Sequence, residues 1–107
     1  MAEPTGVQVF GANFAQTATT FTITKADLPG LTASANNTAE SLLVALLLMV
    51  KSYLTQANFD ANLDQSILVT DSFSSLVTRG TTGYRQSNIN VALHKLDSAT
   101  AIDPDDY

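Results

Sequence analysis

Apolar and polar residues alternate in the first quarter of the chain, which indicates β-structure there. Phe21 and Ile23 lie on one side of a predicted strand at 17–24, and threonines occupy the other side. Threonine suits such a position because its branched Cβ favours extended backbone. A shorter alternation at 6–10, closed by a glycine, predicts another strand.

The last third of the chain predicts a β-hairpin. Residues 66–78 predict a strand with an irregularity, because some of its apolar residues fall at odd positions and others at even positions. Residues 88–95 alternate regularly, with Ile89, Val91 and Leu93 pointing inward. The glycine-containing segment 80–83 is the expected turn between them.

The register of this hairpin needs an irregularity. A four-residue loop would leave Val91 on the wrong face of the sheet, whereas Val91 opposite Phe73 matches the apolar faces. We therefore expect a loop of three or five residues, or a bulge with Gly80 or Gly83 at positive φ.

The strongest helix signal lies between these parts. Asn37 followed by Glu40 matches a capping box, and the residues after it are mostly Leu, Ala and Met without Gly or Pro. We expect a helix over about 38–55, preceded by a linker at 31–36 and followed by a loop at 58–65.

These elements predict an α+β fold. We expect an antiparallel β-sheet of about four strands packed against one long central α-helix, with a C-terminal β-hairpin. The length of 107 residues suits one domain, which we place at 1–98, followed by an acidic C-terminal tail at 99–107.

The predicted helix is apolar on more sides than one sheet can cover. Its broad face, which we expect against the sheet, consists of Ala39, Leu42, Leu43, Leu46, Leu47, Val50, Tyr53 and Leu54. Val44 and Leu48 lie on the opposite side, with Met49 at its rim, and a two-layer fold leaves that side uncovered. Either a loop such as 58–65 covers them or, as we favour, a neighbouring subunit does. Leu48→Asp should then abolish association and leave the monomer folded.

Composition narrows the choice of partners. The chain has five Lys and Arg against ten Asp and Glu, so a nucleic-acid backbone or an anionic membrane surface is not the expected partner. Thr, Ser, Asn and Gln supply 35 of the 107 residues, which keeps a surface polar with little charge. We expect no signal peptide, because an acid stands near the start, and no transmembrane segment, because the longest apolar run is 42–50.

Catalytic signatures are missing from the sequence. The single histidine, His94, lies on the polar side of a predicted strand, and there is no cysteine and no G-x-S-x-G motif. We expect no enzymatic activity and no cofactor.

One segment matches part of a calcium-binding loop. Asp60, Asn62 and Asp64 stand at the first, third and fifth positions, with Asp71 at the twelfth. Gln65 occupies the sixth position, where glycine permits the sharp turn, and the sequence contains no second copy. We therefore expect no metal site here, and local side-chain turns explain the acids better.

The sequence favours a small non-enzymatic structural subunit of a large homo-oligomeric assembly. A bacteriophage virion component (capsid-decorating or tail-associated) or a subunit of a phage-like machine fits best, and the partners are itself and other subunits of the particle. The expected contact residues are Val44, Leu48 and Met49 on the helix, Phe21 and Ile23 on the edge strand, and Asp103, Asp105, Asp106 and Tyr107 in the tail. The alternatives are a monomeric module that binds carbohydrate or a small ligand, assisted by calcium, and an acidic adaptor for a basic protein.

Overall fold

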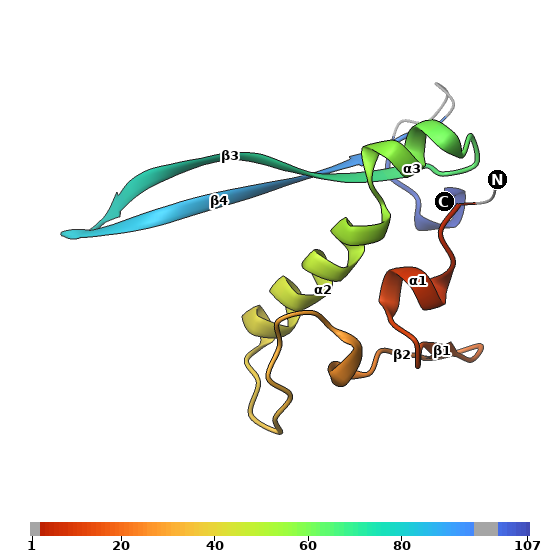
Figure 1. Cartoon of the computed structure of the whole chain (residues 1–107), viewed down its shortest axis with the longest axis horizontal. Helices are drawn as coiled ribbons and strands as arrows, with labels where there is room; N and C mark the ends of the chain where they lie inside the picture. The colour runs from red at the N-terminus through yellow and green to blue at the C-terminus, as the bar shows by residue number, and fades with distance from the viewer. Residues whose placement is uncertain (1–2, 96–100) are drawn as a thin grey trace.

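The computed structural model describes residues 3–95 and 101–107 of the chain. The fold is α+β, with helices and two separate antiparallel sheets of two strands each, β1–β2 and β3–β4. The β3–β4 hairpin extends far beyond the other elements: α3 and the C-terminus lie beside its base, and α2 runs obliquely away from it toward the N-terminal elements (Figure 1). In chain order the elements are α1 (Gly6–Phe10), β1 (Ala15–Gln16), β2 (Phe21–Thr22), η1 (Lys25–Asp27), α2 (Ala39–Tyr53), α3 (Gln56–Ala61), β3 (Ile67–Arg79), β4 (Thr82–Leu93) and η2 (Pro104–Asp106).

The prediction of one sheet of about four strands on a central helix is wrong. One reason is that the expected strand at 6–10 forms the helix α1. The Thr5 hydroxyl accepts a hydrogen bond from the backbone N–H of Gln8, and the Gln8 side chain accepts one from the Thr5 N–H at 2.9 Å. This reciprocal capping box satisfies two of the free amides at the helix start, and Gly11 ends the helix at a φ of 114°.

The second reason lies in the threonine-rich segment predicted as a strand at 17–24. It folds as a tight hairpin, with Gln16 paired to Phe21 and a turn between them. The Thr17 and Thr20 hydroxyl oxygens lie 2.8 Å apart, and the Thr17 N–H donates to the Thr20 carbonyl at 2.7 Å. Short hydroxyl side chains that bond the nearby backbone in this way favour turns over strands.

The helix α2 confirms the main helix prediction, with a different capping residue. Thr38, not Asn37, is the N-cap, and its hydroxyl accepts a hydrogen bond from the Ser41 N–H at 3.1 Å. Asn37 instead holds the preceding loop, where its side chain accepts from the Ser34 N–H and donates to the Thr32 carbonyl. The predicted loop at 58–65 is wrong in its first half, because Thr55 caps the short helix α3.

The predicted C-terminal hairpin is confirmed, but its register differs from the expected one. Arg79 pairs with Thr82 across a two-residue connection in which Gly80 has a φ of 64°. The expected loop of three or five residues is therefore wrong, and although Gly80 has the expected positive φ, the bulge lies away from the turn: the ladder shifts by one residue between Asp71 and Ser74. The Asn88 side chain donates to the Phe73 carbonyl there at 2.7 Å. As a result Val91 lies opposite Val69 and not opposite Phe73.

The core is small. Its buried apolar side chains come one each from α1, the loop after η1, α2 and β3, and they are Val9, Leu28, Ala45 and Val69. The α2 face expected against a sheet is divided: Leu42 and Leu46 lie near Leu28, Leu47 lies near β4, and Leu43 is more than half exposed. No single sheet surface covers this helix in the described part of the chain.

The molecule is open for its size. Its accessible surface is 7935 Å², whereas a compact monomer of this mass exposes about 5,700 Å². Its radius of gyration is 16.3 Å, against about 13 Å for a compact domain of this length. Much of the surface that a globular domain would bury therefore remains exposed in the isolated chain.

Candidate functional site

A ridge on α2, formed by Val44 and Leu48, is the centre of the candidate site. The two residues are one helical turn apart, so they stand one above the other on the same face. Val44 is 54% exposed and Leu48 is partly buried. The structure thus leaves part of the predicted apolar patch open to solvent.

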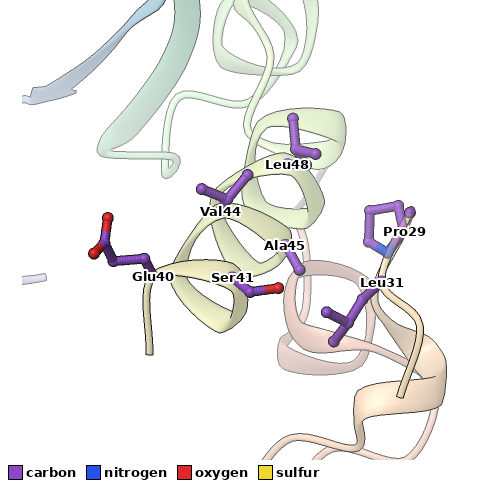
Figure 2. A pocket seen from close by; sticks show the side chains of 8 residues that line it. Pro29, Leu31, Glu40, Ser41, Val44, Ala45 and Leu48 are labelled. Atoms are coloured by element: carbon purple, nitrogen blue, oxygen red, sulfur yellow. The ribbon is translucent and has the colours of Figure 1, made fainter. Parts of the chain in front are cut away.

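Grooves flank the ridge on both sides. The first has a volume of about 320 Å³ and lies between α2 and the loop at Pro29 and Leu31. In Figure 2, Ala45 turns toward that loop, whereas Val44 and Glu40 project from α2 away from it. The second groove, of about 650 Å³, lies between α2 and the bulged part of the hairpin, where Ile89 and Asn88 line it. Val44 and Leu48 line both grooves.

Charged side chains mark the two ends of the ridge. Glu40 stands one turn before Val44 and lines the first groove. At the other end, the Lys51 ammonium lies 2.9 Å from the Asp71 carboxylate of β3. This pair bridges α2 and the hairpin, but its Asp71 side chain is largely exposed, so its net contribution to stability is about 0–1 kcal/mol.

The other predicted apolar contacts lie apart from the ridge. Met49 is partly buried on α2 and lines neither groove. Phe21 is exposed on β2, with its ring centroid 6.3 Å from that of Phe10. Ile23 is partly buried beside a smaller cavity of about 210 Å³, which it shares with Leu42.

The acidic tail turns back onto its own chain. Residues 99 and 100 of the predicted tail lie outside the described residues, and the rest ends in the short helix η2. Asp103 caps that helix by accepting from the Asp105 N–H, and the Asp106 carboxylate lies 3.0 Å from the Lys95 ammonium. Tyr107 lines a cavity of about 410 Å³ together with Glu3, so both ends of the described chain meet there. The basic partner of Asp106 is thus intramolecular in the isolated chain.

The structure adds a group of exposed residues that the sequence reasoning did not single out. They lie on and beside the half of the hairpin beyond the bulge, residues 74–87, which we call the arm. Phe73, at the bulge, is 89% exposed, and Leu76 and Tyr84 on the arm are also exposed. The Arg79 guanidinium lies over the Tyr84 ring, 5.7 Å from its centroid. The alternation that predicted these strands does not reveal that the described part of the chain leaves most of the arm uncovered.

The segment that matched a calcium loop does not form one loop, because its two ends belong to α3 and β3. Asp60 belongs to α3 and accepts a hydrogen bond from Gln56, while Asp71 belongs to β3 and pairs with Lys51. Across residues 3–95 and 101–107, no group of three or more His, Cys, Asp or Glu side chains lies close enough to hold a metal ion. The His94 ring packs on Phe59 with centroids 4.7 Å apart.

Among the described residues, no helix has the length and apolar character needed to cross a membrane.

Comparison with protein-family models, with curated proteins and with solved structures finds no match for this chain.

Proposed function

We propose that this chain is a small non-enzymatic structural subunit of a large homo-oligomeric assembly. A bacteriophage virion component, either capsid-decorating or tail-associated, or a subunit of a phage-like machine is the class that fits best. Its partners are further copies of itself and other subunits of the same particle, and it acts by packing and not by chemistry.

The observation that carries this proposal is the open surface of the isolated chain. The excess over a compact monomer, about 2,200 Å², is of the size that a subunit loses on forming permanent contacts with its neighbours. Large apolar side chains are spread over this surface, on α2, on β2, in the connection after α3 and along the hairpin, and several are more than half exposed: Phe21, Val44, Leu63, Phe73 and Leu76. Burial of apolar area is the main favourable term in association.

The long hairpin supports the same proposal. Two-stranded hairpins are marginally stable in water unless a further strand or a helix packs against them. Among the described residues no further strand and no helix covers the arm, and all of its residues except Val77 are exposed. A neighbouring subunit would supply the missing packing.

Polar composition favours a particle subunit over a charged adaptor. The strands carry many Ser, Thr, Asn and Gln side chains and few charges. Neutral polar side chains keep a surface soluble without the like-charge repulsion that accumulates when many identical copies pack together.

The test is the particle mass measured by size-exclusion chromatography with light scattering, over a range of protein concentrations and with or without millimolar calcium. We expect a mass of several times 11.3 kDa that does not depend on calcium. Electron microscopy of the same fraction should show rings, tubes or shells of uniform size. A monomer at every concentration would contradict the proposal, and a monomer stabilised by calcium would favour a ligand-binding module.

A further inference from the structure

We propose that the arm of one copy packs on the α2 ridge of a neighbouring copy, with Leu76 on Val44 and Leu48, and Arg85 beside Glu40. This inference rests on the proposed function, because it names the contact through which the copies assemble. The occupant of the ridge is thus a second copy of this chain.

One face of the arm presents an apolar residue next to a base. Leu76 of β3 lies directly opposite Arg85 of β4, and directly opposite residues in an antiparallel ladder project to the same face. Leu76 is 74% exposed. The preceding pair on this face, Ser74 and Ser87, lines the groove beside the subunit's own α2.

The opposite face of the arm has different chemistry. Val77 pairs with Tyr84, and Arg79 lies over the Tyr84 ring, so this arginine is engaged within its own arm. The two arginines therefore differ in their roles. Arg85 is the one that stands beside an exposed leucine.

The α2 ridge presents the complementary pattern. Glu40, Val44 and Leu48 follow one another at four-residue intervals, so an acid stands next to two apolar residues along one line of the helix surface. Grooves on both sides of Val44 and Leu48 leave room for an inserted side chain. Leucine opposite the apolar pair and arginine opposite the glutamate match in both hydrophobicity and charge.

The distribution of charge favours a second copy as the occupant. The arm contains two arginines and no acid, whereas the rest of the chain has three lysines and ten acids. A positively charged arm and a negatively charged body attract each other between copies of the same chain. Within one chain Leu76 and Val44 do not cover each other, since each remains more than half exposed.

A charge exchange tests the polar half of this contact. Arg85→Glu should weaken association about tenfold, because it places two acids together at the contact. Arg79→Glu is the matched control: it makes the same change on the opposite face of the same arm, so it lowers only the general attraction between arm and body and should weaken association much less. Adding Glu40→Lys to Arg85→Glu should restore association. Equal losses for both arginine variants, or no rescue by Glu40→Lys, would overturn the proposed pairing.

Disulfide trapping tests the apolar half. The chain contains no cysteine, so Val44→Cys and Leu76→Cys can be introduced into separate preparations, one of them enlarged by a tag, and then mixed and oxidised. We expect a cross-link between the two different chains. Leu43→Cys mixed with Leu76→Cys is the control, because Leu43 is as exposed as Val44 but lines neither groove.

These experiments separate the inference from the proposed function. If the unmodified chain assembles but the Val44→Cys and Leu76→Cys chains do not cross-link, the arm contact is wrong and the assembly subunit stands. Cross-linking of Val44→Cys only to itself would likewise overturn the arm contact in favour of a helix-to-helix contact. If the unmodified chain is a monomer at every concentration, both proposals fail.

Discussion

At the scale of single residues, Gly11 has the most constrained position among the glycines, because it combines a positive φ with a close neighbour. It ends α1 at a φ of 114°, a conformation that residues with a Cβ rarely adopt. A Cβ at this position would lie 2.6 Å from the Cβ of Asp27. Asp27 cannot easily yield, because its carboxylate accepts hydrogen bonds from both the backbone and the side-chain nitrogen of Asn13.

We therefore expect Gly11→Ala to lower the free energy of unfolding by about 1–3 kcal/mol. Urea denaturation followed by circular dichroism measures this change. Gly30→Ala is the control, since Gly30 also has a positive φ but has no atom within 4 Å of the added Cβ. It should cost less than Gly11→Ala, and an equal cost would show that contact with Asp27 contributes nothing.

At the scale of elements, the sequence predicts α2 and the hairpin well and the N-terminal segment poorly. α2 and the hairpin are long, so their apolar periodicity extends over several turns or residue pairs. The N-terminal elements are short, so local hydrogen bonds decide their structure. Thr5 and Gln8 carry a readable capping-box signal for α1, whereas the Thr17–Thr20 turn has no distinctive turn residue.

The exposed arm could have been predicted from lengths alone. A strand of 13 residues is about 43 Å long, whereas a helix of 15 residues is about 22 Å long. One such helix cannot cover one such strand. The positions of Glu40, Val44 and Leu48 on one line were likewise readable from their spacing. The grooves beside them were not, because they depend on where the loop at 29–31 and the bulge of β3 fall.

Two neighbouring residues of α2 allow a controlled test of its ridge. Val44 and Leu43 are equally exposed, at 54%, but only Val44 lines the grooves. We expect Val44→Asp to raise the dissociation constant of the assembly at least about tenfold, because it places a charge in an apolar contact. Leu43→Asp should leave that constant within about threefold, since surface substitutions have small effects.

Circular dichroism should show that both α2 variants remain folded, with a similar small loss of helix stability, and light scattering measures their mass. Val44 is a better test position than Leu48, which is partly buried and supports the fold of the monomer as well. Equal assembly of the two variants would exclude the ridge as a contact.

The arm should show its dependence on neighbours in hydrogen exchange. In dilute monomer, we expect the amides of residues 74–79 and 82–87 to exchange faster than those that pair Ile67–Asp71 with Ile89–Leu93, because the β3 residues of that base are mostly buried or half-buried, whereas nearly all residues of the arm are exposed. In the assembly the arm amides should become protected. Mass spectrometry of peptides at both concentrations measures the difference. Equal protection of arm and base in the monomer would show that the hairpin is stable without a neighbour.

At the scale of the whole molecule, we expect the small core and the open surface to make stability depend on protein concentration. The chain buries few large apolar side chains, and Val69 is the only one the structure encloses completely among the described residues. Folding and association should therefore be coupled, so that a tenfold rise in protein concentration raises the melting temperature by about 3–7 °C, with the larger value for the larger assembly. Differential scanning calorimetry over a hundredfold range of concentration measures this shift.

Two variants separate association from folding. Val44→Asp should make the melting temperature nearly independent of protein concentration, because it removes association without removing the core. Gly11→Ala should lower the melting temperature at every concentration by a similar amount, so that its rise with concentration stays the same. A melting temperature independent of concentration in the unmodified chain would mean that the monomer is stable by itself, and its exposed apolar surface would then need another explanation.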